Sequence, residues 1–218
     1  MPSKEEEEGL VARYTGPVCR LCRRERTKLF LKGPKCMSAK CPITIGRFPP
    51  GEHGRDRQRQ PSEYSQQLRE KQKARRTYGV LGKQFSRTYR VAARQQGLTG
   101  ERLLQLLELR LDNVVYRAGI GASRAQARQL VKHGHLLVDG KRVDIPSFTV
   151  KPGSTVSLKP SSRDLAIVEF NREVVNHEVP AWLERVEGGS GVRVLNPPLR
   201  EQIDTEVREQ LIVELYSK

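Results

Sequence analysis

The stretch that most constrains the fold of this chain runs over residues 109–158. Apolar residues recur at helical spacing across residues 111–118, which predicts a short helix. Ser123, followed three residues later by glutamine, forms a capping box and predicts a second helix that ends near Gly134. Residues 139–140 read Asp-Gly between two short β-type runs, which predicts a hairpin with a type I′ turn. Together these signals predict a helix–helix–hairpin unit.

One side of this unit is basic. Four cations lie along the second helix and its approach: Arg117, Arg124, Arg128 and Lys132. The last three are spaced four residues apart and share a helical face, so Ala125, Leu130 and Val131 are expected to face inward. Only Asp139 and Asp144 lie near enough in the sequence to neutralise the cations. The pattern favours a nucleic-acid surface, and a solvated cationic face is the alternative.

The charge of the whole chain also favours a polyanionic partner. The net charge is +15, and residues 1–98 hold 23 of the 40 basic residues but only 9 of the 25 acidic ones. Such an excess repels itself unless nucleic acid, or an acidic membrane face, neutralises it. No apolar run reaches the roughly 18 residues of a membrane span, and the first residues lack the features of a signal peptide. We therefore expect a cytoplasmic protein.

Four cysteines form two close pairs, Cys19 with Cys22 and Cys36 with Cys41. Two such pairs can complete a tetrahedral thiolate shell around one zinc ion, and a closed shell leaves no water for catalysis. The pattern predicts a structural zinc knuckle, with an iron–sulfur cluster or metal-free thiols as alternatives. Metal binding would supply much of the folding energy of a segment with so few apolar residues.

The remaining elements follow from caps and turns. Residues 1–10 read as an acidic tail, and residues 42–61 as irregular basic chain that can follow a phosphate backbone or serve as a plain linker. Further helices are predicted over residues 62–78 after the N-cap Ser62, over 83–96, from a cap at Thr99, and from Ser161 or Ser162 to about 176. Strands are predicted over 155–158, 183–186 and 192–195, and a helix or strand over 206–215.

The side chains expected inside the helix over 83–96 are Phe85, Tyr89, Val91 and Ala92. The sequence thus predicts an α+β fold: an N-terminal zinc knuckle and helical region, an inserted helix–helix–hairpin RNA-binding module and a mixed C-terminal segment. The expected divisions are an acidic tail 1–10, the knuckle 11–48, a basic helical region 49–98, the module 99–160, and a segment 161–218 that packs back on the helical region.

The assembled motifs resemble the bacterial small-ribosomal-subunit protein four family over nearly all of residues 11–218. The motifs that carry the resemblance are Ala12–Pro17, the four cysteines with Lys28–Gly33, Pro50–Gly54, Lys71–Arg75, Lys83–Phe85, Leu111–Arg117, Ser123–Arg128 and Leu211–Ser217. The family occurs with and without the cysteines, so the resemblance implies the zinc-binding form. The module resembles the RNA-binding domain named after this family, which recurs in pseudouridine synthases and tyrosyl-tRNA synthetases.

The resemblance implies a structural, non-enzymatic ribosomal protein that is cytoplasmic and ribosome-bound, and a monomer within the ribosome. It would bind small-subunit rRNA directly, nucleate assembly of the 5′ domain, neighbour small-subunit proteins five and three, and help form the mRNA entrance. Family members can also repress their own translation. The predicted RNA contacts are Arg13, Arg23, Arg24, Lys28, Arg47, Arg55, Lys71, Lys73, Arg75, Arg76, Lys83, Arg87, Arg110, Arg117, Arg124, Arg128, Lys132 and Lys141.

Two other functions fit parts of the pattern less well. An RNA-modifying enzyme could carry the same module, but about 60 residues after Leu158 are too few for a catalytic domain. A zinc-dependent DNA-binding regulator would need a recognition helix near the cysteines, and the Gly-Pro break at residues 33–34 argues against one.

Overall fold

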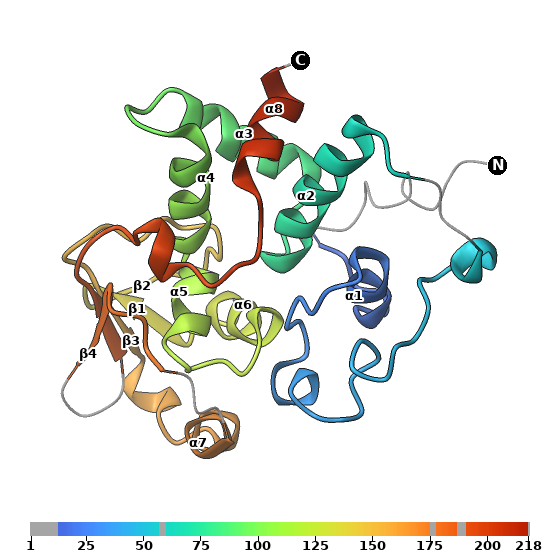
Figure 1. Cartoon of the computed structure of the whole chain (residues 1–218). Helices are drawn as coiled ribbons and strands as arrows, with labels where there is room; N and C mark the ends of the chain where they lie inside the picture. Colours follow the sequence, from blue (N-terminus) through green and yellow to red (C-terminus); the bar gives the residue numbers. More distant parts are fainter. Residues whose placement is uncertain (1–12, 57–59, 175–177, 187–190, 218) are drawn as a thin grey trace.

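The computed structural model describes residues 13–56, 60–174, 178–186 and 191–217. Within these residues the protein combines helices with one antiparallel sheet, which confirms the predicted α+β class. Three parts lie together in Figure 1: a body of helices, a unit built around the sheet, and an N-terminal stretch of mostly loop that lies beside both. We call these the helical body, the sheet unit (residues 109–194) and the cysteine segment (residues 13–56).

The helical body contains four helices. They are α2 (Glu63–Thr77), α3 (Gly82–Ala93), α4 (Thr99–Glu108) and α8 (Glu209–Ser217), and α8 lies against α2 and α4. The terminal stretch predicted as helix or strand is therefore a helix. Its apolar core includes Phe85, Leu103, Leu104, Leu107 and Ile212. These side chains are fully buried, so the C-terminal helix closes a core that the leucine-rich α4 begins.

Local caps explain where these helices begin, with one correction to the predicted caps. The Ser62 hydroxyl accepts a hydrogen bond from the backbone N–H of Ser65, which confirms the predicted N-cap of α2. Thr99 is the first helical residue of α4 rather than its cap, because the chain turns into the helix at Leu98.

Val91 of α3 is 44% exposed and faces solvent rather than the core. The predicted apolar stripe of α3 is therefore narrower, and it comprises Phe85, Tyr89 and Ala92.

The sheet unit begins with the predicted helix–helix–hairpin. Its elements are α5 (Leu111–Arg117), α6 (Arg124–Lys132), β1 (Leu136–Val138) and β2 (Lys141–Arg142). The Ser123 hydroxyl accepts from the N–H of Gln126, and Asp139 and Gly140 both have positive φ, at 50° and 77°. The N-cap and the turn are thus confirmed, but the capping box is not complete, because the Gln126 side chain accepts from the N–H of Ala122 rather than from that of Ser123. Ala127, not Ala125, faces inward beside Leu130 and Val131.

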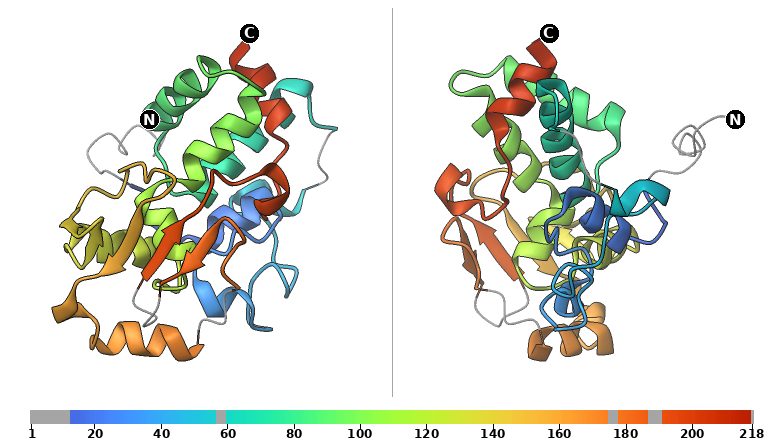
Figure 2. Two further views of the ribbon diagram at one scale, coloured as in Figure 1. Left: turned by 90° about the vertical axis from the view of Figure 1, so that its left-hand side faces the viewer. Right: turned by 45° about the vertical axis from the view of Figure 1, so that its right-hand side comes forward.

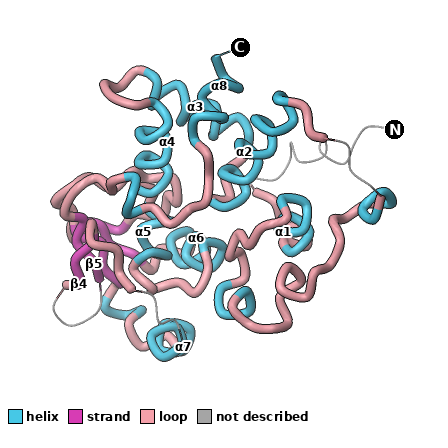
Figure 3. The backbone as a smooth tube through the Cα atoms, viewed as in Figure 1, coloured by secondary structure: helices cyan, strands magenta, loops and turns pink. Residues whose placement is uncertain are grey.

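Three more strands complete the sheet. They are β3 (Thr155–Leu158), β4 (Leu183–Arg185) and β5 (Gly191–Val194), and the order across the antiparallel sheet is β2-β1-β3-β5-β4. Figures 2 and 3 show the sheet beside α5 and α6, with α7 (Ala166–Val174) at the far end of the unit. Trp182 and Val194 join Leu136 and Val156 in one apolar core, so the hairpin depends on strands that arrive more than 40 residues later.

The C-terminal segment therefore divides between two cores. Its strands extend the sheet, whereas the chain from the 3-10 turn Arg200–Gln202 to α8 returns to the helical body, where Ile203 and Val207 join the apolar core. Ser161 and Ser162 lie in a single 3-10 turn (Pro160–Ser162), and α7 begins later, at Ala166. The predicted acidic tail, the predicted end of this helix near 176 and the glycine-rich loop before β5 lie outside the described residues.

The cysteine segment holds little regular structure. Its elements are α1 (Cys19–Glu25) and the short turns Gly33–Cys36 and Glu52–Arg55. Glu25 at the end of α1 reaches the helical body, where its carboxylate pairs with Arg69 and Arg76 of α2. Gly33 lies directly against the backbone carbonyl of Ala122 at the start of α6. The segment is thus attached to both other parts of the protein.

Candidate nucleic-acid interface

A buried ion pair lies where the helical body meets the sheet unit. Two nitrogens of Arg117 on α5 donate to the two carboxylate oxygens of Glu108 on α4, at 2.8 and 2.9 Å. Tyr78 and Asn113 also donate to Glu108, at 2.7 and 2.6 Å. Burial raises the pKa of Glu108, but the charge and hydrogen bonds of Arg117 outweigh burial and hold this pKa below its ordinary value. Arg117 also donates to Asp204, before α8.

A second ion cluster neutralises two more of the predicted RNA contacts. Arg110 donates to both oxygens of Asp112, at 3.1 and 2.8 Å, and Arg128 approaches the same carboxylate at 3.2 Å. The prediction that only Asp139 and Asp144 could neutralise the basic face is therefore wrong. That prediction counted only carboxylates close to the arginines in the sequence. The fold brings carboxylates from α4, α5 and the C-terminal segment to these arginines.

Burial separates the predicted RNA contacts into three sets. The exposed set is Arg13, Arg24, Arg47, Arg55, Lys83, Arg87, Lys132 and Lys141, and the half-buried set is Arg23, Lys28, Lys71, Lys73, Arg75, Arg76, Arg124 and Arg128. Arg110 and Arg117 are buried, with 4% and 8% of their surface exposed. The guanidinium groups of both residues form ion pairs with carboxylates of this chain. These two arginines therefore have a structural role in place of the expected RNA contact.

Arg124 occupies a different environment from these buried arginines. Its guanidinium carbon lies 4.5 Å from the ring centre of Tyr116 and 5.1 Å from that of Tyr78. Its Nε donates to the side-chain oxygen of Asn113 at 2.8 Å. Aromatic faces attract a guanidinium and hold it in one orientation. Arg124 is thus a fixed cation at the junction of two cavities, because it lines both.

The first of these cavities is strongly basic. It has a volume of about 550 Å³ and lies between residues 13–31, the end of α2 and the start of α6. Five arginines line it, and we call it the arginine groove: Arg13, Arg75, Arg76, Arg124 and Arg128. Asp112 is the acidic residue of its lining and is already paired with Arg110 and Arg128. The groove therefore keeps a positive excess that suits a phosphate backbone.

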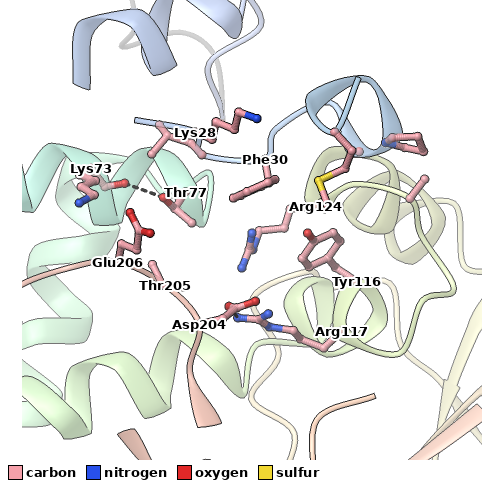
Figure 4. A pocket seen from close by; sticks show the side chains of 15 residues that line it. Lys28, Phe30, Lys73, Thr77, Tyr116, Arg117, Arg124, Asp204, Thr205 and Glu206 are labelled. Carbon is pink, nitrogen blue, oxygen red and sulfur yellow. Dashed lines mark hydrogen bonds and ion pairs between the residues drawn. The ribbon is translucent and has the colours of Figure 1, made fainter. Parts of the chain in front are cut away.

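The second cavity has a volume of about 460 Å³ and lies on the other side of Arg124. Figure 4 shows Phe30, Lys28 and Lys73 on its walls together with Asp204 and Glu206. The residues come from the cysteine segment, α2, α5, α6 and the chain before α8. All three parts of the protein therefore meet around this cavity.

The acidic residues of this interface were not predicted from the sequence. Glu108 follows Leu104 by four residues and therefore lies on the apolar stripe of α4. A charged residue on a buried helical face is a signal from which an internal ion pair could have been predicted. Asp204 gave no local signal, because it is 87 residues from Arg117 in the chain. Likewise, nothing local connects Tyr78 to Arg124.

Three of the four cysteines are buried, and Cys19 is half-buried. The backbone N–H of Lys32 donates to the Cys36 sulfur at 3.3 Å, and burial raises the pKa of the Cys22 and Cys36 thiols. The donor chemistry suits a thiolate metal site. However, among the described residues no three His, Cys, Asp or Glu side chains stand close enough to hold a metal ion. Zinc binding therefore stays a prediction.

Comparison with known proteins identifies the family. Residues 13–108 match the model of the ribosomal protein S4/S9 N-terminal domain, and residues 109–156 match that of the S4 domain. Proteins called small ribosomal subunit protein uS4 are 58% identical in Dictyoglomus turgidum and 55% identical in Thermoanaerobacter sp. (strain X514). Each match covers 95% of this chain and all of the relative.

These relatives are structural components of the ribosome, which agrees with the expectation that the chain is not an enzyme. Among the described helices, none is both long and apolar enough to cross a membrane. From the two domain matches and the full-length relatives we conclude that the chain belongs to the small ribosomal subunit protein uS4 family.

Proposed function

We propose that this protein binds small-subunit rRNA directly as a structural component of the small ribosomal subunit. The observation that carries the proposal is the arginine groove, whose five guanidinium groups outnumber the two carboxylates that pair with them, Asp112 with Arg128 and Glu25 with Arg76. A ribose-phosphate backbone laid in this groove would gain several charge-assisted hydrogen bonds. Folded RNA offers its phosphates and 2′-hydroxyls to such a surface, because its deep major groove is closed to side chains.

The exposed cations extend the contact beyond the groove. Arg24, Arg47 and Arg55 lie along the cysteine segment, and Lys132 lies at the end of α6. The guanidinium of Arg55 is 5.4 Å from the ring centre of Phe48, an arrangement that holds the charge at the surface. RNA would therefore contact the cysteine segment broadly and the sheet unit locally.

The finer roles rest on the family. We propose that the protein nucleates 5′-domain assembly early, neighbours small-subunit proteins five and three, and helps form the mRNA entrance as a single copy in the cytoplasmic ribosome. Repression of its own translation would use the same rRNA-binding surface on a messenger RNA. Supporting such a role, the cationic side chains that line the groove are arginines, which bind the phosphate backbone of any RNA.

Removing groove charge tests rRNA binding. The double variant Arg13→Ala/Arg75→Ala should bind a 5′-domain rRNA fragment at least 10-fold more weakly in a filter-binding assay. The slope of log affinity against log salt should also become shallower by roughly one to two, because a protein that makes fewer phosphate contacts releases fewer counterions on binding. The matched control, Lys151→Ala/Arg163→Ala, removes two exposed charges outside the groove and should keep the wild-type slope. Equal slopes in the two variants would contradict the proposal.

We also propose that Cys19, Cys22, Cys36 and Cys41 bind one structural zinc ion. The backbone N–H that Lys32 donates to the Cys36 sulfur supports the proposal, since such a hydrogen bond stabilises thiolate against the burial that raises the pKa of Cys36. Binding would draw the thiols together and tighten the segment between Cys19 and Cys41.

Metal analysis of the purified protein should find zinc, and Cys36→Ser should release it. The control Met37→Ser changes a neighbouring side chain that is 74% exposed and should keep the metal. Iron in the wild-type protein, or no metal at all, would contradict the zinc assignment.

A further inference from the structure

The cavity beside the arginine groove, here called the Phe30 cavity, differs from the groove in its chemistry. Its volume of about 460 Å³ falls in the range of small-ligand pockets, roughly 300–1,000 Å³. Its walls combine an aromatic ring, an oriented arginine, two lysines and two carboxylates. A phosphate backbone needs neither a ring nor carboxylates, so this lining indicates a different ligand group.

Phe30 presents its ring to the cavity at a conformational cost. Its φ is 51°, in the left-handed region that non-glycine residues rarely occupy, and 41% of its surface is exposed. An exposed aromatic ring on a strained backbone is unfavourable for the free protein. Strain of this kind is retained where it serves a site. Figure 4 shows the Phe30 ring and the Arg124 side chain in the same part of the cavity.

Arg124 offers hydrogen-bond donors in a fixed position. Tyr78 and Tyr116 hold its guanidinium, and its Nε is used by Asn113. Among the described residues, no hydrogen bond engages its two terminal Nη groups. A guanidinium with these groups open can donate two parallel hydrogen bonds to neighbouring acceptors of a ligand.

Carboxylates lie next to this donor. The side chain of Asp204 is 75% exposed although one of its oxygens accepts from Arg117. The partial desolvation of this carboxylate beside Arg117 raises its pKa, but the hydrogen bond and charge of Arg117 and the charge of Arg124 outweigh this, so its pKa stays below the ordinary value. Glu206 also lines the cavity and lies next to Lys73 in Figure 4, and Lys28 contributes a second positive charge.

We propose that the Phe30 cavity holds one unstacked guanine nucleotide of the bound RNA. The base would stack on Phe30, because aromatic rings bind the π-face of a base. The Nη groups of Arg124 would donate to O6 and N7 of guanine, the pairing that arginine geometry favours. The carboxylates would accept from its N1–H and N2–H groups, and a lysine would contact its phosphate.

The lining selects guanine among the four bases. Only guanine presents two adjacent acceptors beside two adjacent donors, and these match a guanidinium beside a carboxylate. Adenine lacks the paired donors, and uracil and cytosine are smaller and lack N7. A free guanine nucleotide has the same chemistry as one in RNA, so the experiment must separate these two sources.

The inference rests on the proposed rRNA binding, and Phe30→Ala with Phe30→Trp as the matched control tests it. The wild-type protein should protect one unpaired guanine of the rRNA fragment from a reagent that attacks N1 and N2. Phe30→Ala should lose this protection and bind roughly 5-fold to 100-fold more weakly, the range for one lost stack. Its salt slope should fall by no more than roughly one, because at most the single lysine contact to the phosphate of this nucleotide is lost. Phe30→Trp keeps a ring and should restore protection.

The outcomes separate the two proposals. If the wild-type protein does not bind the fragment, rRNA binding itself fails. If it binds with a steep salt slope but protects no guanine, or if Phe30→Ala protects the same guanine, the cavity inference is overturned and the groove proposal stands. Titration of the protein alone with GMP, AMP, CMP and UMP completes the test. Tight GMP binding that Phe30→Ala abolishes, with unchanged RNA affinity, would overturn the RNA source in favour of a free nucleotide.

Discussion

The sheet unit and the cysteine segment are built on different physical principles. The sheet unit surrounds one apolar core that includes Trp182, Leu136 and Val194. In residues 13–56 the buried side chains are Leu29 and three cysteines. Burial of apolar surface is the main stabilising contribution to folding, and the cysteine segment has little of it. Its position depends instead on ion pairs with α2, on close contact at Gly33 and, by our proposal, on zinc and RNA.

This difference also separates the arginines of the two regions. Those of the sheet unit near α4 are paired with carboxylates inside the protein, whereas most cations of the cysteine segment face solvent. A chain this basic therefore divides its positive charge between internal structure and a partner surface. Each region can therefore be disrupted by substitutions that leave the other intact.

Removing the buried carboxylate should have the largest effect. Glu108→Gln leaves Arg117 buried without its main counter-charge, and the loss of one partner of a buried pair costs about 3–5 kcal/mol. Urea unfolding followed by circular dichroism measures the loss. Glu184→Gln, on the exposed face of β4, should change the free energy of unfolding by less than about 0.5 kcal/mol. Similar losses in both variants would contradict a special role for Glu108.

Acid should weaken the same contact to a smaller extent. The folded-state pKa values of Glu108 and Asp204 are lowered, mainly because the charge and hydrogen bonds of Arg117 outweigh burial. Their stabilisation is complete above the unfolded-state pKa, about 4, and is lost as pH falls through the lower folded-state values. The free energy of unfolding should therefore fall below about pH 4, and less steeply in Glu108→Gln. A curve that is equally steep in both proteins would exclude this linkage.

The cysteine segment should respond to a change that leaves the sheet core intact. A Cβ on Gly33 would lie 2.3 Å from the carbonyl oxygen of Ala122, and its φ is +56°. Gly33→Ala should destabilise docking of the segment by roughly 1–3 kcal/mol. Hydrogen exchange should accelerate over residues 19–41 and stay unchanged in β1 and β3.

Gly46→Ala is the matched control for Gly33→Ala. Gly46 also has a positive φ, +74°, but nothing lies within 4 Å of its added Cβ. It therefore reports backbone strain without a clash. Equal acceleration in both variants would show that contact with Ala122 does not position the segment.

Local signals explain how much of the fold could be predicted from the sequence. The caps at Ser62 and Ser123 and the turn at residues 139–140 act over a few residues, so the sequence displays them directly. The five-stranded sheet does not follow from such signals. Its strands β3 and β5 are hydrogen-bonded neighbours although α7 lies between them in the sequence. Only the shared apolar core around Trp182 selects that pairing.

For the candidate RNA-binding site, the sequence indicated which arginines could take part but not which of them are paired inside the protein. Residue type and spacing identified Arg13, Arg75 and Arg128 as candidate contacts, and all three line the groove. The same reasoning treated Arg117 as a surface residue, because its partners Glu108 and Asp204 are 9 and 87 residues away. Charge in a sequence indicates a polyanion, but only the folded chain shows which charges remain available for it.

The smallest predicted effect compares two helix caps. The hydroxyls of Ser123 and Ser62 each accept one backbone hydrogen bond at 3.3 Å, and loss of such a cap costs about 0.5–2 kcal/mol. Ser123→Ala should fall near the upper end, because α6 is packed in the sheet core. Ser62→Ala should fall near the lower end, because the exposed first turn of α2 can fray. Thermal unfolding of both alanine variants measures the difference, and Ser123→Asp should recover stability by restoring an acceptor. A larger loss at Ser62 would mean that the helical body, rather than the sheet unit, limits the stability of the protein.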